Sequence, residues 1–325
     1  ENSGIETTTG PLGQGIANGV GLALAEEILK NKLGKKVFNH KTYVLAGDGC
    51  LMEGISHEAL SLAGHLKLKN LIVFFDNNKI SIDGSTSLSV SDNYKKRFEA
   101  YGWDYFEING HNEKQINTAI NKAKKTKKPS LISCKTIIGF GSPNKAGKAS
   151  SHGAPLGEDE IKLIRKKLKW PYEPFKIPQE ILNHWRKIGE KGTELEKEWL
   201  NSLNNSSVKI KEKFNSINNK IFRDKLNDLI VKEKEKFFNT KPSLATRQCS
   251  MKVIETISDF LPNLIGGSAD LSGSNNTKTK KNKIINFKNF DGNYIHYGVR
   301  EHGMAAIMNG LALYGGIIPY GGTFL

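Results

Sequence analysis

The sequence predicts an α/β fold with parallel sheets, and three observations support this prediction. Apolar runs at residues 43–46 and 71–75 each resemble a strand, and they lie roughly thirty residues apart, about one crossover unit. Helix-like and strand-like patterns alternate through residues 1–160. A similar alternation begins again at residue 241. With 325 residues, the chain is long enough for about two such units.

Within residues 1–160, the patterns predict each element in turn. Residues 16–32 are expected to form a helix with small residues (Ala17, Gly21 and Ala25) on one face, which would allow close packing. The other expected helices are 56–66 and the amphipathic segment 112–125. Strands are expected at 42–46, 71–75 and 130–136. A loop rich in Gly, Ser and Lys follows at 139–153.

Residues 161–240 differ in composition, with many Lys, Glu and Asn residues. Trp170, Trp185 and Trp199 are expected to be sparse apolar anchors, and three prolines interrupt the start of the segment. We expect helices that link two domains and pack partly over the surface. A long disordered tether is the alternative.

Residues 241–325 are expected to begin the second α/β unit. The patterns predict helices at 245–260 and 301–314, and short strands at 264–267 and 294–298. The pattern then stops, too early for a complete domain. Because the chain starts at Glu1 without Met, we expect both of its ends to be cut, so a targeting segment cannot be read.

Composition excludes several classes of protein. No apolar run approaches the roughly 18 residues of a membrane span. The three cysteines lack C-x-x-C spacing, which favours a reducing compartment, and we expect the cytoplasm. The net charge of +15 comes from short lysine runs without an RNA-binding aromatic motif or a zinc finger, so no nucleic acid partner is expected. The positive field can still attract phosphorylated substrates.

Oxygen-bearing side chains follow the first two expected strands. Asp48 follows the first strand, and Asn78 follows the second. Parallel strands that end side by side would bring both residues to one crevice. A carboxylate and an amide without thiol or imidazole suit a hard ion, Mg²⁺ or Ca²⁺. Gly47 and Gly49 leave the backbone bare where a diphosphate could approach, so a metal-bound diphosphate cofactor is indicated.

Three common motifs are rejected. Gly49 and Gly54 have phosphate-loop spacing, but Ile55 stands where that loop needs Lys. Residues 13–15 lack the third glycine of a dinucleotide-binding fingerprint. His57 has no second His four residues later, which excludes the zinc-protease helix. The glycine-rich run TTGPLGQG at residues 8–15 leads into a helix. It suits an anion or a flat heterocycle, or is simply a tight turn with a helix cap.

His152 and Glu301 each allow two interpretations. His152, in a flexible loop, is a surface or structural histidine, or belongs to a loop that closes over phosphate. Glu301 is a charge partner of a helix N-terminus. Alternatively, it faces an apolar pocket with a raised pKa and donates a proton to a ring nitrogen.

The motifs together resemble the transketolase family of thiamine diphosphate enzymes, from the first residues of the chain to the last. The resemblance rests on the run at 8–15, GDG at 47–49 with Asn77 and Asn78, HGAPL at 152–156, GSADL at 267–271, GVREH at 298–302 and GGTF at 321–324. It implies a parallel-sheet thiamine diphosphate-binding fold. Residues 1–160 would be most of a diphosphate-binding domain, 161–240 a helical linker, and 241–325 the first part of a pyrimidine-binding domain.

The resemblance also implies the site residues. Mg²⁺, with Ca²⁺ as a possible substitute, would be held by Asp48, Asn78 and the backbone carbonyl of Ile80. Cofactor contacts would come from Gly10, Leu12, Gly49, Ile82, Leu271, Glu301 and Phe324. Substrate contacts would come from His152, Arg247 and Ser274. Glu301 would bond the aminopyrimidine nitrogen, and His152 would contact the reacting sugar or the diphosphate, so these two are the catalytic candidates.

The implied reaction is reversible transfer of a two-carbon ketol unit from a ketose phosphate to an aldose phosphate, through a thiamine diphosphate ylid, in the non-oxidative pentose phosphate pathway. The family site lies between two subunits of a homodimer. Family histidines upstream and the C-terminal domain are absent, so we expect this chain alone to be inactive. A dihydroxyacetone synthase-like transferase and a non-catalytic thiamine-fold binding protein are the alternatives.

Overall fold

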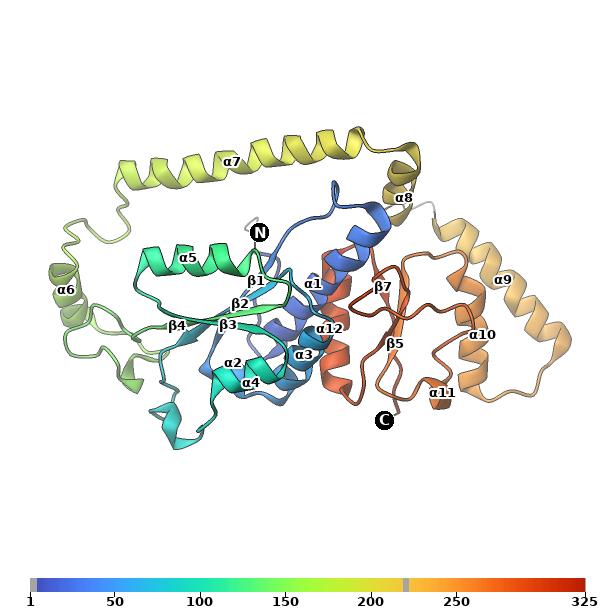
Figure 1. Ribbon diagram of the computed structural model, residues 1–325, viewed down its shortest axis with the longest axis horizontal. Coiled ribbons are helices and arrows are strands. Elements are labelled where there is room, and N and C mark those ends of the chain that lie inside the picture. The colour runs from blue at the N-terminus through green and yellow to red at the C-terminus, as the bar shows by residue number, and fades with distance from the viewer. Residues whose placement is uncertain (1–4, 219–221, 325) are drawn as a thin grey trace.

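The computed structural model describes residues 5–218 and 222–324 (Figure 1). Two parallel sheets lie on either side of a central pair of crossing helices, and a long helix runs along one side of the molecule from the first sheet to the central helices. The elements before the linker are α1 (Gln14–Leu33), β1 (Thr42–Gly47), α2 (Asp48–Met52), α3 (Gly54–His65), β2 (Leu71–Asn77), η1 (Thr86–Leu88), α4 (Tyr94–Ala100), β3 (Asp104–Asn109), α5 (Glu113–Ala123), β4 (Ser130–Lys135) and η2 (Ala149–Ser151).

The first sheet has the order β1-β2-β4-β3 and is parallel throughout. On one face, α1 and α3 belong to a large apolar core that includes Val73 and Phe75 of β2. On the other face, α5 covers a smaller core that includes Ile72 of β2 and Ile132 of β4. A parallel sheet that is covered on both faces requires strands that are apolar throughout. That requirement explains why the inner strands β2 and β4 are recognisable in the sequence. Strand β1 lies at an edge and its Leu45 is 85 % exposed, but it is recognisable because its run is apolar all the same.

The prediction of three strands in this region was incomplete. A fourth strand, β3, lies at the sheet edge beside β4, with the sequence DYFEIN. Only Ile108 of this strand is buried, because an edge strand has one side open. Its polar and aromatic mixture therefore lacks the continuous apolar run by which buried parallel strands are recognised. The short helices α2 and α4 were also missed.

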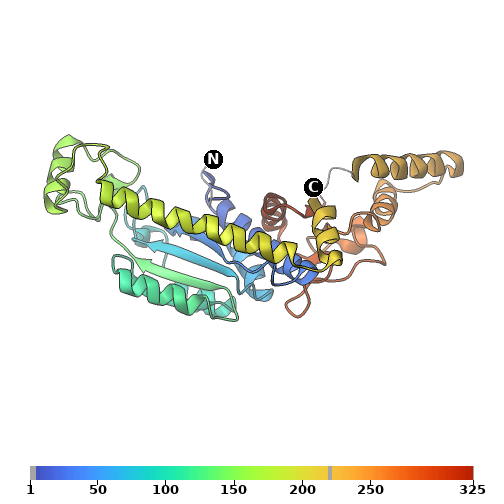
Figure 2. The ribbon, with the colours of Figure 1, turned by 90° about the horizontal axis from the view of Figure 1, so that it is seen from above.

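The segment after the first sheet is helical wherever the structure describes it as regular. Its helices are α6 (Glu158–Lys167), α7 (Gln179–Asn204), α8 (Val208–Asn218) and α9 (Phe222–Thr240). Figure 2 shows α7 extended along the molecule. The prediction of helices is confirmed and a disordered tether is wrong for the described residues. Trp199 anchors α7 through a hydrogen bond from Nε1 to the Val37 carbonyl (2.9 Å). Trp185 is 67 % exposed, so its expected role as an anchor was wrong.

The second sheet is smaller, with the parallel order β6-β5-β7. The expected helices and strands are all present, while α11 and β7 were not expected. The elements are α10 (Thr246–Ser258), β5 (Leu264–Ser268), α11 (Ser272–Asn275), β6 (Tyr294–His296), α12 (Glu301–Tyr314) and β7 (Ile318–Pro319). No helix within the described residues combines the length and apolarity that crossing a membrane requires.

Helices α1 and α12 cross at the centre of the molecule and join its two halves (Figure 1). At the crossing, a Cβ added to Gly21 would lie 2.2 Å from the Ile307 carbonyl oxygen, and one on Gly310 would lie 2.1 Å from the Asn18 carbonyl oxygen. Only glycine fits at such a distance. The small residues that were predicted on one face of the first helix therefore let α12 approach it closely. Helix α1 is buried on nearly all sides as a result.

Candidate functional site

The first candidate group lies where β1 and β2 end side by side. Their parallel register pairs Gly47 with Asp76, close to the two candidate segments. Asp48 is the first residue of α2, and Asn78 follows the last residue of β2. The expectation that the two strands deliver these residues to the same edge of the sheet is therefore met by the strand pairing.

Asp48 is a buried carboxylate that lacks a full set of hydrogen bonds. Its side chain belongs to a residue that is 5 % exposed, and Oδ2 has no hydrogen-bond partner in the described part of the chain. Burial is the main cause that raises the pKa of this carboxyl to about 6; the nearby Asp76 carboxylate acts in the same direction, and the backbone N–H groups of Lys79 and Asn78 act against it. An unpaired buried carboxylate is costly unless a cation balances it.

Asn78 and Ile80 form a tight loop next to Asp48. Oδ1 of Asn78 accepts from the Ile80 N–H (2.9 Å), and Nδ2 of Asn78 donates to Asp76 Oδ2 (3.2 Å). Lys79, between them, has φ +60°. The side-chain turn of Asn78 thus stabilises a backbone shape that few residues adopt.

These groups fit a hard divalent cation. Asp48 offers an unpaired carboxylate oxygen, Asn78 an amide oxygen with a second lone pair, and Ile80 a backbone carbonyl. Oxygen ligands of these kinds are what Mg²⁺ and Ca²⁺ take. In residues 5–218 and 222–324 no group of three His, Cys, Asp or Glu side chains is placed to hold a metal, so the candidate set depends on amide and carbonyl oxygens as well.

The glycine-rich loop lies against the start of α2. A Cβ on Gly49 would lie 3.0 Å from Cδ1 of Leu12, so these two candidate cofactor residues are adjacent. Gly10 faces open space, since a Cβ added there would have nothing within 4 Å. Leu12 and Ile82 are 51 % and 75 % exposed. The first group therefore combines Asp48 with bare backbone and exposed apolar side chains, as a site for a flat ring and an anion requires.

The second candidate group lies at the end of β5. Ser268 Oγ donates to the Gly322 carbonyl (3.0 Å) and accepts from the Leu271 N–H (3.1 Å) and from Asn275 Nδ2 (3.0 Å). Ser268 is fully buried, so it ties the motifs at 267–271 and 321–324 together. Leu271 is half-buried and Phe324 is 56 % exposed. Sequence reasoning assigned no role to Ser268 or Asn275, although Ser268 lies within the GSADL motif.

Glu301 is the first residue of α12 and is exposed. In the part of the chain that the structure describes, its carboxylate makes no hydrogen bond or ion pair. Its neighbours are bound to the first half of the molecule: Nε2 of His302 lies 2.8 Å from Nε2 of Gln14, and the Gly303 N–H donates to Oε2 of Glu58 (2.6 Å). The start of α12 is therefore held in place, while the Glu301 carboxylate has no partner among the described residues and can bind another group.

The three candidate substrate-binding residues are far apart in sequence and belong to different elements. His152 follows η2, Arg247 is on α10 and Ser274 is on α11, and all three are exposed. Among residues 5–218 and 222–324, no hydrogen bond or ion pair joins them to each other. None joins the first group to the second either. A single chain thus presents two separate candidate groups.

Arg97 and Tyr94 form a pair that packs against α2 and β2, and this pair was not anticipated from the sequence. Nη2 of Arg97 donates to the Leu51 carbonyl on α2 (3.1 Å), and its guanidinium lies 4.8 Å from the centre of the Tyr94 ring. Tyr94 in turn packs edge-on against Phe75 of β2, with 4.9 Å between ring centres. Both residues come from α4, which is too short to show a helical pattern, so only the tertiary contacts reveal their role.

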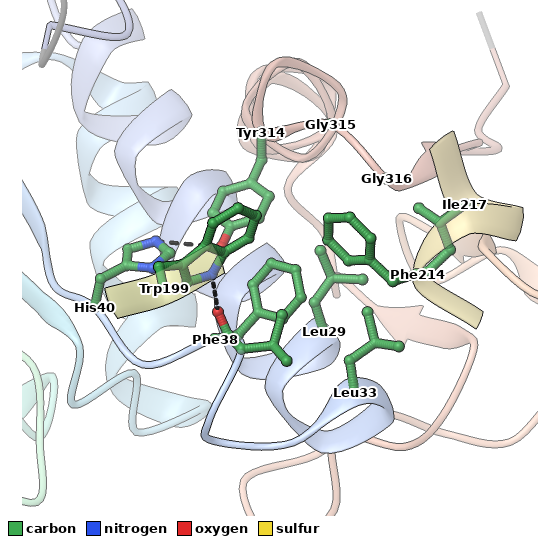
Figure 3. Close-up of a pocket in the computed structure, with 11 residues that line it drawn as sticks. Leu29, Leu33, Phe38, His40, Trp199, Phe214, Ile217, Tyr314, Gly315 and Gly316 are labelled. Carbon is green, nitrogen blue, oxygen red and sulfur yellow. Dashed lines mark hydrogen bonds between the residues drawn. The ribbon is translucent and has the colours of Figure 1, made fainter. Parts of the chain in front are cut away.

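A separate pocket of about 370 Å³ lies between the linker and the core, away from the candidate groups (Figure 3). Its polar groups bond to each other: Nε2 of His40 lies 3.2 Å from the Tyr314 hydroxyl, and Trp199 donates to Val37. The pocket shows how α7 and α8 attach to α1 and α12. It is lined by Leu29, Leu33, Val37, Phe38, His40, Trp199, Phe214, Ile217, Tyr314, Gly315 and Gly316.

Comparison with protein families finds two matches along the chain. The family described as "Transketolase, thiamine diphosphate binding domain" matches residues 1–225, and "Transketolase, pyrimidine binding domain" matches residues 242–325. Among curated proteins, the chain is 49 % identical to the transketolase of Sinorhizobium medicae over 99 % of this chain and 46 % of the relative. It is 50 % identical to that of Buchnera aphidicola from Acyrthosiphon pisum, over 100 % of this chain and 50 % of the relative.

Solved structures give the same result for the fold. The crystal structure of transketolase from Campylobacter jejuni matches 99 % of this chain and 49 % of its own, with a TM-score of 0.89 and 40 % identity. A Pichia stipitis transketolase in complex with sedoheptulose 7-phosphate matches with a TM-score of 0.86 and 39 % identity, over 99 % of this chain and 49 % of its own. The chain spans about half the length of the curated relatives it matches.

Proposed function

This chain belongs to the transketolase family, and from that membership we propose that it supplies the thiamine diphosphate site of a ketol-transferring enzyme. The enzyme would transfer a two-carbon unit between a ketose phosphate and an aldose phosphate. The observation that carries the proposal is the buried Asp48 carboxylate with an unpaired oxygen, next to Asn78 at the edge of a parallel sheet. Relatives from Pichia stipitis were solved with sugar phosphates, which supports this substrate class.

In this proposal Asp48, Asn78 and the Ile80 carbonyl hold Mg²⁺. When bound, the metal neutralises a diphosphate and the thiazolium ring supplies the carbon nucleophile and electron sink for the transfer. Gly49 would give that diphosphate room, and Gly10, Leu12 and Ile82 would line the ring site. Calcium has the same ligand preferences and is a possible substitute.

The second group would complete the cofactor site. Leu271 and Phe324 present apolar surface to the ring system, and Glu301 holds a proton between its carboxylate and a ring nitrogen. His152 would contact the sugar or the diphosphate. Arg247 and Ser274 would bind the substrate phosphate, for which the guanidinium fork of arginine is well suited.

We further propose that the two groups meet across a homodimer, with the metal ligands from one subunit and Glu301 from the other. The absence of any bond between the groups in the described residues of one chain supports this arrangement. The domain division proposed with it is a diphosphate-binding domain at 1–160, a linker at 161–240 and a pyrimidine-binding part at 241–325. A cytoplasmic location stays a prediction.

The proposal is tested by calorimetry of thiamine diphosphate binding to this chain. We expect binding in the presence of Mg²⁺, loss of binding with a chelator, and loss in Asp48→Ala. Asp228→Asn, an exposed substitution on α9, is the control that should bind normally. If the chain does not bind, the same titration is made on the natural protein that contains this sequence. Failure there too would refute the cofactor site.

A further inference from the structure

The loop that carries His152 is anchored by side chains from outside it. The loop covers residues 137–152, between β4 and α6. At its start, the Ile137 N–H donates to Nε2 of His111 (3.0 Å), and the Phe140 ring stacks on the His111 ring with 4.0 Å between their centres. His111 follows β3, so the beginning of the loop is attached to the connection of a neighbouring strand.

Glu160 on α6 anchors the middle of the loop. Its carboxylate accepts from the Ser142 hydroxyl, from the Asn144 N–H (2.9 Å) and from the Asn144 side-chain amide (2.9 Å). Glu160 and Ser142 are only 7 % and 1 % exposed. The Ser142 bond, followed by the two from Asn144, lowers the pKa of Glu160 to about 2. The carboxylate thus stays charged at neutral pH and holds three donors on one segment of the loop.

Hydrogen bonds continue from this anchor to His152. Ser142 Oγ accepts from the Lys145 N–H (2.9 Å), and the Lys145 carbonyl accepts from the Ser151 hydroxyl (2.6 Å). Ser151 immediately precedes His152. Gly139, with φ +63°, also lies close to Ser151, since a Cβ there would be 3.0 Å from the Ser151 Oγ. The His152 side chain makes no hydrogen bond to the described residues, so the backbone of the loop decides where the imidazole lies.

We propose that Glu160 is a positioning residue for His152. Its carboxylate fixes the loop conformation that presents the imidazole to the phosphorylated sugar. The part of this inference that concerns the sugar rests on the proposed function, whereas the anchoring of the loop does not. Glu160 acts only through Ser142, Asn144 and the backbone that follows them.

The anchoring is tested by hydrogen–deuterium exchange on this chain. Glu160→Gln replaces one carboxylate oxygen, which accepts hydrogen bonds, by an NH2 group, which can only donate. This group would face the donors of Asn144, so the loop should open more often. The N–H groups of Asn144 and Lys145 should then exchange about tenfold to a hundredfold faster. Glu158→Gln is the matched control, because Glu158 lies on the same helix and is exposed. Ser142→Ala removes one donor to Glu160 and also the acceptor of the Lys145 N–H, so it should raise the Lys145 rate by at least as large a factor and the Asn144 rate by a smaller one. This second variant keeps the test decisive if Glu160→Gln does not fold. Unchanged exchange at both residues would overturn the anchor.

The link to His152 is tested by a double-mutant cycle in the natural protein that contains this sequence. With fructose 6-phosphate as donor and ribose 5-phosphate as acceptor, Glu160→Gln should lower kcat/KM by about tenfold. In a His152→Ala background the same change should lower it less than about twofold, because the group that it positions is gone. Equal factors in both backgrounds would show a merely structural role and overturn the proposal. No transfer by the wild type would refute the proposed function, and the exchange result would still decide the anchor.

Discussion

At the scale of single residues, Asp48 illustrates a conflict between stability and metal binding. Its carboxyl group is buried, one oxygen lacks a partner in the described part of the chain, and its pKa is raised from 3.8 to about 6. A carboxyl whose pKa is raised by folding destabilises the folded state as pH rises through the range between those values. This destabilisation of the folded state reaches its full value above about pH 6. A bound cation would remove this destabilisation, so the site is stable only when a cation occupies it.

Asp48→Asn should therefore stabilise the metal-free chain. We expect the free energy of unfolding in chelator at pH 7.5 to rise by about 1 kcal/mol, less than the full pKa shift implies, because solvent screens part of the charge. Thermal unfolding measures the difference, with Asp228→Asn as the surface control. With Mg²⁺ and thiamine diphosphate present, only the wild type should gain stability. A wild type as stable as Asp48→Asn in chelator would contradict the unpaired-carboxylate argument.

Glu160 has the opposite behaviour with pH. Its folded pKa of about 2 lies below the usual 4.5, so the stability that it contributes is present above pH 4.5 and is lost as pH falls toward 2. We expect pepsin cleavage within residues 139–153 to increase over that range in the wild type. Glu160→Gln should already be cleaved at pH 4.5, whereas Glu158→Gln should follow the wild type. Cleavage of Glu160→Gln that tracks the wild type at every pH would contradict the assignment.

Residues differ in how far the sequence can predict their roles. Asp48 and Leu12 lie in contiguous motifs next to strong strand or helix patterns, so their neighbourhood can be inferred from sequence order. The structure indeed places Leu12 against Gly49, directly after Asp48. Glu160 and His111 bond to residues 16 to 26 positions away. No local pattern identifies such partners, because the contacts depend on how the loop folds back.

At the scale of elements, the crossing of α1 and α12 depends on two glycines. Alanine normally favours a helix over glycine by about 1 kcal/mol. At Gly21 and Gly310, however, a Cβ would overlap backbone atoms of the partner helix. We expect Gly21→Ala and Gly310→Ala to lower the free energy of unfolding by about 2 kcal/mol or more, since the helices must separate. Denaturant unfolding measures the change.

The same substitution on α7 provides the control. Gly189 lies in that helix with nothing within 4 Å of a Cβ position. Gly189→Ala should raise stability by up to about 1 kcal/mol through helix propensity alone. If alanine were tolerated equally at Gly21 and Gly189, the close crossing would be refuted.

Elements were predictable where burial imposes a pattern. Strands β2 and β4 lie inside the first sheet, supply residues to the two cores and show continuous apolar runs. Strand β1 lies at an edge but also has a continuous apolar run. Strand β3, at the other edge, has Asp, Glu and Asn among its apolar residues and therefore shows no such run, so it was missed. Helices were expected in residues 161–240, but the sequence could not tell which tryptophan packs against the rest of the molecule. Trp199 bonds to Val37 while Trp185 is exposed, a choice set by how α7 crosses the molecule.

At the scale of the whole molecule, one chain presents two halves of a proposed site without joining them. The first half carries Asp48 and Asn78 at the edge of the first sheet. The second carries Glu301, exposed at the start of α12. Hydrogen bonds of His302 and Gly303 to the first half of the same chain fix the start of α12. Glu301 is therefore not free to move to the metal ligands. A second subunit is the direct way to bring the halves together, and closed twofold symmetry would then form two equivalent sites.

Complementation between two inactive variants tests this arrangement in the natural protein that contains the sequence. Asp48→Ala and Glu301→Ala should each abolish ketol transfer, because each removes one half of every site. If the halves come from different subunits, unfolding and refolding an equal mixture gives mixed dimers in which one site has both defects and the other has none. Random pairing should then restore about a quarter of the wild-type activity. Mixing without subunit exchange is the control and should restore nothing. Continued inactivity after exchange, with dimers verified by sedimentation, would place both halves of the site in one chain and refute the shared site.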